Sequence, residues 1–257
     1  MIGIRSRCVL AHGTRISTMA DVVPLLKQGL STLQSGQLPE VSLLRALVSK
    51  ALGYGIVAGA SLLKLPQILG VLRSGSAAGL NLASFELENI GYSIHTAYGF
   101  ILGLPFSAYG EAVIILLQNT LLLSIIYHYA RAPLWRGFLM IILTAYGGYF
   151  VLSGSATEKM VMSAYELNNF IFILARVPQI WSNYKAKDTG QLSLITSGMS
   201  TAGAVARIFT SVQEGAGLSM VRGFCIGGVL NMIITLQILC YAKNTQAQTK
   251  KLAKKKE

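Results

Sequence analysis

The chain of 257 residues contains seven long apolar stretches with few charges, and this feature limits it to a membrane-spanning fold. Hydrophobic residues make up 53% of the sequence and charged residues only 12%, about half the share in a soluble domain. About 20 apolar helical residues cross a bilayer, and continuous rather than alternating apolar runs favour helices over barrel strands. We therefore predict an all-α membrane protein with spans near 50–70, 80–103, 109–129, 135–153, 160–182, 191–211 and 221–242.

An internal repeat divides these spans into two equivalent sets of three. The motif Lys64-Leu65-Pro66-Gln67-Ile68 recurs 112 positions later, from 64 to 176, as Arg176-Val177-Pro178-Gln179-Ile180, and the same offset aligns Asn119 with Asn231. Spans one to three therefore correspond to spans five to seven, and the fourth span is a linker. A single linker helix gives both repeats the same orientation, and transporters with such parallel repeats bind substrate at the repeat interface.

The repeat also sets the predicted domain boundaries. Residues 1–47 show no signal-peptide pattern and form a flexible or interfacial lead-in. The remaining parts are a first three-helix repeat in 48–132, a linker helix in 133–156, a second repeat in 157–243 and a basic tail in 244–257.

The two basic-x-Pro-Gln-Ile motifs in a three-plus-one-plus-three layout resemble the PQ-loop family, which includes the SWEET sugar carriers and the lysosomal cystine exporter. Further blocks resemble its mannose-P-dolichol utilization branch: Ser76-Ala77-x-Gly79-Leu80, Ser107-x-Tyr109-Gly110-Glu111-Ala112, Thr189-Gly190-Gln191-Leu192-Ser193 and residues 206–214. The resemblance covers about residues 48–243 and implies a SWEET-like fold of seven transmembrane helices.

The same resemblance implies an endoplasmic-reticulum protein required for the use of dolichol-phosphate-mannose and dolichol-phosphate-glucose in N-glycan precursor, GPI-anchor and related glycosylation. It would bind or translocate these lipids. Two alternatives stay open: a non-transporting chaperone or scaffold that presents the lipids to luminal glycosyltransferases, and a carrier of a soluble sugar or amino acid.

No catalytic constellation is visible, because His12, His95 and His128 are scattered and no HExxH, GxSxG or P-loop motif occurs. We therefore expect no enzyme activity, cofactor or metal site. The net charge of +12 is concentrated at helix ends and in the tail rather than in a nucleic-acid footprint. The expected partners are the lipid bilayer and the dolichol-phosphate-linked sugars, and no nucleic acid.

The distribution of basic residues predicts the orientation. One set of loops holds five, Arg73, Arg131, Arg136, Lys185 and Lys187, on the same side as the Lys-rich tail, and the opposite loops hold only Lys159 and Arg222. Basic loops stay cytosolic, so we predict a cytosolic C-terminus and a luminal N-terminus, although residues 1–50 carry six further basic residues. Lys254 and Lys255 fit a dilysine pattern for retrieval to the endoplasmic reticulum.

Three basic residues inside the spans are candidates for binding a phosphate. An ionisable side chain costs about 2.5–3.5 kcal/mol at the centre of a membrane helix, so Lys64, Arg176 and Arg207 are expected to face the bundle interior. Lys64 and Arg176 lie near the cytosolic ends, where snorkelling is the alternative. For Arg207 the alternative is a structural ion pair with Glu214.

Polar residues also form stripes on two predicted spans. Glu88, Tyr92 and His95 share one face of the second span, and Glu166, Asn169 and Arg176 share one face of the fifth. These stripes indicate either a cavity for hydroxyl and phosphate groups or hydrogen bonds that hold the helices together.

Two symmetric pairs complete the candidate site. Asn119 and Asn231 lie mid-membrane on the third helix of each repeat, where a neutral amide can bind sugar hydroxyls or form a packing contact. Pro66-Gln67 and Pro178-Gln179 are predicted hinges or static kinks, because proline removes a helical hydrogen bond.

Overall fold

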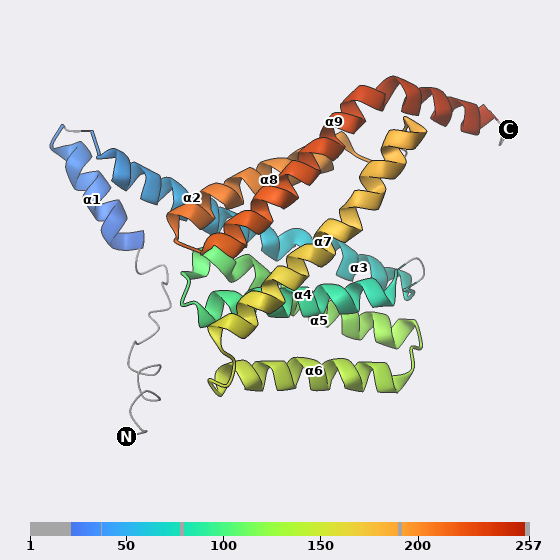
Figure 1. Ribbon diagram of the computed structural model, residues 1–257, viewed down its shortest axis with the longest axis horizontal. Coiled ribbons are helices and arrows are strands. Elements are labelled where there is room, and N and C mark those ends of the chain that lie inside the picture. Colours follow the sequence, from blue (N-terminus) through green and yellow to red (C-terminus); the bar gives the residue numbers. More distant parts are fainter. Residues whose placement is uncertain (1–21, 37, 78–79, 190–191, 255–257) are drawn as a thin grey trace.

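The computed structural model describes residues 22–36, 38–77, 80–189 and 192–254, and every regular element among them is an α-helix (Figure 1). The helices are α1 Val22–Gln34, α2 Val41–Leu63, α3 Leu65–Ser74, α4 Leu82–Ile101, α5 Phe106–Tyr129, α6 Leu134–Leu152, α7 Glu158–Ala186, α8 Leu194–Gln213 and α9 Leu218–Lys254. Lys64 alone separates α2 from α3, so these two helices form one interrupted pass.

Successive passes run back and forth between two ends of the molecule. Figure 1 shows the α3–α4, α5–α6 and α7–α8 connections at one end and the α4–α5, α6–α7 and α8–α9 connections at the other. We call the first the tail end, because α9 finishes there, and the second the α1 end.

Helix contacts confirm the two predicted repeats. In the first repeat α5 packs against α2 and α4, and in the second α9 packs against the equivalent α7 and α8. Between the repeats, α2 contacts α8 and α7 contacts α4, so each first helix touches the second helix of the other repeat. This exchange is the pattern of a pseudo-twofold axis. The linker α6 packs against α4 and α5 of the first repeat.

Helices begin and end at equivalent residues of the two repeats. The side chain of Asn81 accepts a hydrogen bond from the backbone of Ser84 at the start of α4, and Ser193 does the same at the start of α8. The helices before them end in left-handed residues at Gly75 and Lys187, again 112 positions apart.

Four segments are long and apolar enough to cross a membrane: Val41–Ser74, Phe106–Tyr129, Trp135–Leu152 and Leu218–Ala242. The chain is therefore a multi-pass helical membrane protein. The helices α4, α7 and α8 carry more polar residues, and these are the helices on which most candidate site residues lie. That they span the bilayer in a SWEET-like arrangement of seven stays a prediction.

The structure extends the first pass toward the N-terminus. The expected span began at residue 50, but α2 begins at Val41, and Gly29 of α1 packs against the side chain of Leu47. Pro24 and Pro39 interrupt the apolar pattern there, which is why the sequence did not predict these helices; Pro24 lies in the first turn of α1, where proline is tolerated.

The two Pro-Gln motifs take different local structures. Pro66 follows the break at Lys64 and occupies the first turn of α3, whereas Pro178 lies inside the continuous α7. At the break, the amide that bonds the freed backbone is Gln118 of α5, which accepts from Lys64 N at 3.2 Å and donates to the carbonyl of Ser61. The backbone at this break is therefore bonded by an amide from another helix.

Two apolar clusters show where the repeats are packed together. One, at the tail end, lies within the first repeat and α6 and includes Phe85, Leu122 and Met140. The other, at the α1 end, joins both repeats and includes Tyr98, Tyr109, Val161, Tyr165 and Met220. The repeats are thus sealed against each other at the α1 end.

Candidate functional site

A cavity of about 790 Å³ lies between the repeats and is lined by α2, α4 and α5 of the first and by α7, α8 and α9 of the second. Seven pairs of its lining positions differ by the repeat offset of 112. They are Ile56 and Asn168, Glu88 and Ser200, Gly91 and Gly203, Tyr92 and Ala204, His95 and Arg207, Glu111 and Gly223, and Ile115 and Gly227. The cavity therefore lies on the pseudo-twofold axis, as expected for a carrier with parallel repeats.

Although these positions are equivalent, their chemistry differs. The lining carboxylates, Glu88 and Glu111, come from the first repeat, where the second has Ser200 and Gly223. The lining guanidinium groups, Arg176 and Arg207, come from the second repeat. The charges of the wall are therefore distributed asymmetrically about the axis.

Lys64 forms an ion pair with Glu88. Its ammonium lies 2.7 Å from Oε2 of Glu88 and 5.0 Å from the centre of the Phe85 ring, and its side chain is buried. Lys64 does not line the cavity, whereas its partner Glu88 does. The pair leaves little charge at this point to attract an anion.

Arg176 differs from Lys64 because its equivalent partner is missing. The position that corresponds to Glu88 is Ser200, and no carboxylate of the described residues lies within 4.0 Å of the Arg176 guanidinium. Arg176 lines the cavity and is partly buried. It is a cation without an ion-pair partner in the described wall.

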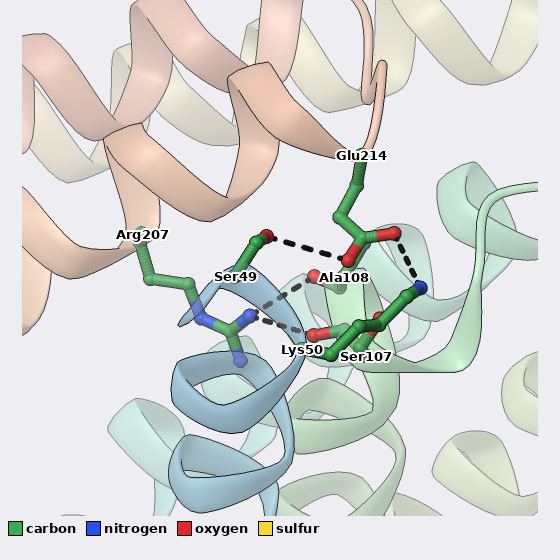
Figure 2. Close-up of polar contacts among 6 residues, drawn as sticks. All are labelled: Ser49, Lys50, Ser107, Ala108, Arg207 and Glu214. Atoms are coloured by element: carbon green, nitrogen blue, oxygen red, sulfur yellow. Dashed lines mark hydrogen bonds and ion pairs between the residues drawn. The ribbon is translucent and has the colours of Figure 1, made fainter. Parts of the chain in front are cut away.

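Arg207 joins the two repeats. It is only 3% exposed, its Nε lies 2.7 Å from Oε1 of Glu111, and its Nη1 donates to the carbonyls of Ser107 at 3.0 Å and Ala108 at 3.4 Å (Figure 2). The Glu111 contact is an ion pair without the angle of a hydrogen bond, and Nη2 has no hydrogen-bond partner among the described residues.

The predicted alternative for Arg207, an ion pair with Glu214, is wrong. Glu214 instead accepts from Nζ of Lys50 at 2.7 Å and from the hydroxyl of Ser49 at 3.4 Å, and Figure 2 shows these contacts beside the Arg207 contacts. Glu214 directly follows α8, two turns beyond Arg207, and it contacts the first half of α2 rather than its own helix.

His95, the equivalent of Arg207, lies in the cavity wall and is partly buried. Its ring packs edge-on against Tyr165, with 5.3 Å between ring centres, and lies 6.2 Å from the ring of Phe224. Its Nε2 is buried and has no hydrogen-bond partner among the described residues.

The two equivalent asparagines, which were predicted as a pair, have different roles in the structure. Asn119 is fully buried and donates to the carbonyl of Phe85 at 3.0 Å, so it ties α5 to α4, while Asn231 lines the cavity. In the second repeat Thr235 joins the helices instead, through Ser197 and Thr201 of α8.

The polar residues predicted to share one face of α7 do not all line the cavity. Asn169 lines the cavity and donates to the carbonyl of Ser219 at 3.5 Å, whereas Glu166 forms an ion pair with Arg222 away from the lining. Asn168 was not predicted, yet it lines the cavity and its side chain lies against Gly91 of α4. Of the retrieval lysines, Lys254 ends α9 and Lys255 lies outside the described residues.

Two three-helix repeats around a largely apolar cavity with a few polar and charged residues, on their pseudo-twofold axis, define a transporter-type membrane protein. The comparisons agree: the PQ loop repeat matches residues 48–108 and 167–220, and the chain belongs to the PQ-loop repeat family. It is 30% identical to Solute carrier family 66 member 3 of Homo sapiens over 183 residues, which are 70% of this chain and 88% of that protein. No solved structure is significantly similar to the chain.

Proposed function

We propose that the chain is a carrier of the endoplasmic-reticulum membrane that binds dolichol-phosphate-mannose and dolichol-phosphate-glucose in the cavity between its repeats. The resemblance to the mannose-P-dolichol utilization branch of the PQ-loop family suggests this ligand. The observation that carries the proposal is the combination of Arg176, which has no ion-pair partner in the described wall, with large apolar lining residues that have exposed side chains.

Each part of such a lipid has a matching part of the wall. The phosphodiester is anionic and suits the guanidinium of Arg176. The sugar suits neutral amides, and Asn168, Asn169 and Asn231 supply three. The isoprenoid chain suits the apolar lining residues Leu87 of α4 and Phe172 of α7, which are 61% and 58% exposed and so offer uncovered apolar surface.

The proposed orientation places the tail end in the cytosol and the α1 end in the lumen. Basic residues of the α3–α4, α5–α6 and α7–α8 connections lie at the tail end, which favours the cytosol. The mixed apolar cluster around Tyr98 and Tyr165, and the hydrogen bond from Tyr98 to the carbonyl of Ala216, close the α1 end. In this orientation the lipid enters the cavity from the cytosolic leaflet.

A soluble sugar or amino acid is the second candidate ligand. One observation favours it: the similar human protein is named a solute carrier. A small solute would need the amides and Arg176 but not the exposed apolar side chains of Leu87 and Phe172, so substitutions at these two residues distinguish the two ligands.

The test is reconstitution of the purified protein in vesicles with a short-chain dolichyl-phosphate-mannose analogue. We expect protein-dependent, stereoselective movement of the analogue across the bilayer that is lost in Arg176→Gln and retained in Arg73→Gln, which removes an exposed arginine at the same end of the molecule. Binding without movement would replace the carrier with a lipid-presenting chaperone. Absence of binding would overturn the lipid ligand.

A further inference from the structure

Among the described residues, three buried polar atoms of the cavity wall have no hydrogen-bond partner: Nε2 of His95, and Nη2 and Nε of Arg207, of which Nε lies against Glu111 in the ion pair. Leaving a buried polar atom without a hydrogen bond costs about 1–3 kcal/mol. The two residues occupy equivalent positions of the repeats, so they lie on opposite sides of the pseudo-twofold axis. A ligand that supplies partners to both would remove this cost.

The electrostatics of this pair suit a neutral group rather than an anion. The charge of Arg207 is already compensated by Glu111 at 2.7 Å, and two backbone carbonyls accept from its Nη1. An anion placed at Nη2 would be repelled by Glu111. A hydroxyl can accept from Nη2 and can donate to or accept from an imidazole nitrogen, so it satisfies both atoms without adding charge.

Arg176 offers the opposite environment at a different depth of the cavity. Tyr165, which packs on the His95 ring, precedes Arg176 by eleven residues of α7, from 165 to 176, or about 16 Å along the helix at 1.5 Å per residue. A single phosphate cannot contact both places. A sugar phosphate can, because its hydroxyls and its phosphate are separate groups.

Resting on the proposed function, we propose that the cavity binds the two polar parts of its ligand at separate subsites. Arg176 binds the phosphate near the tail end, and His95 with Arg207 binds the sugar hydroxyls nearer the sealed α1 end. The subsite of His95 and Arg207 then determines whether the chain distinguishes a glycosylated lipid phosphate from a bare one.

The test measures binding of two probes, short-chain dolichyl-phosphate-mannose and short-chain dolichyl phosphate, to the full chain in lipid nanodiscs. Wild type is expected to prefer the mannosylated probe by about tenfold, the worth of one or two hydrogen bonds. His95→Phe keeps a ring against Tyr165 and Phe224 and is expected to reduce this preference while its affinity for dolichyl phosphate stays the same. Arg176→Gln is expected to weaken binding of both probes by the same factor.

His128→Phe is the matched control, because His128 is an exposed histidine of α5 that does not line the cavity. It should keep the wild-type preference. The two-subsite proposal is overturned if wild type binds both probes equally, or if His95→Phe weakens both by one factor, and in either case the lipid-binding function stands. Failure of wild type to bind either probe overturns the proposed function itself.

Discussion

Arg207 and Glu111 form an ion pair that joins α8 of the second repeat to α5 of the first, with 2.7 Å between Nε and Oε1. Both residues line the cavity, and Arg207 is almost completely buried. The pair therefore joins the two repeats and forms part of the cavity wall at the same time.

Replacing Glu111 with Gln should destabilise the fold, because Arg207 would keep a buried charge without its counter-charge. Breaking a buried ion pair costs about 3–5 kcal/mol, and the lower end applies here because the Glu111 side chain is 18% exposed. Thermal unfolding in detergent should show a clear fall in Tm. Glu166→Gln is the control: its pair with Arg222 is far more exposed and should be worth about 0–1 kcal/mol. Equal effects of the two changes would contradict the structural role of Glu111.

The Lys50–Glu214 pair should behave as one unit in a double-mutant cycle. Lys50→Glu and Glu214→Lys each place like charges about 3 Å apart at the α1 end of the repeat interface, so each should lower Tm. The double exchange should recover part of the loss, with a coupling energy of about 0.5–3 kcal/mol. Strictly additive losses would show that the two side chains do not interact.

The two motif prolines should differ in their effect on lipid movement. Pro178→Ala restores a backbone donor inside α7 and should straighten it, while Pro66→Ala acts in the first turn of α3, where proline costs little. We expect Pro178→Ala to slow translocation of the dolichyl-phosphate-mannose analogue more than Pro66→Ala, with lipid affinity unchanged in both. Unchanged translocation in both variants would favour a chaperone that does not move its helices.

Substitution of the two equivalent asparagines should separate stability from binding. Asn119→Leu removes a fully buried hydrogen bond between α5 and α4 and should lower Tm, at about 1–3 kcal/mol. Asn231→Leu changes the cavity wall and should lower ligand affinity at nearly constant Tm. The comparison needs a melting curve and a binding isotherm for each variant; a loss of Tm with Asn231→Leu would mark it as a packing residue.

The repeat and the position of the cavity could be predicted from the sequence, because an offset of 112 identifies equivalent positions before any coordinates are known. Six of the nine candidate binding residues line the cavity: Glu88, His95, Asn169, Arg176, Arg207 and Asn231. They share a physical property that sequence reveals, namely a polar group at helical spacing inside an apolar span.

The remaining candidates do not line the cavity. Residues at equivalent positions of the two repeats have different interaction partners, and the sequence repeat does not reveal these partners. Lys64 has Glu88, but Arg176 has Ser200 at the same place and so stays unpaired. Asn119 ties two helices together, but in the second repeat Thr235 stands where the first has Leu123, and Asn231 is released to the cavity. The ion-pair or hydrogen-bond partner of each residue is decided by contacts between helices that are far apart in the chain.

The peripheral position of α6 has a consequence for the thickness of the bilayer around this helix. This helix packs against α4 and α5, and its other sides expose Phe138, Ile141, Ile142 and Tyr149. Its apolar segment, Trp135–Leu152, has 18 residues and so measures about 27 Å at 1.5 Å per residue. That length matches a thin hydrocarbon layer of about 27 Å, whereas a layer of about 32 Å would have to thin around α6 at a cost of a fraction of a kcal/mol per Å. The length of α6 thus predicts that the bilayer thins around this helix wherever its hydrocarbon layer exceeds about 27 Å.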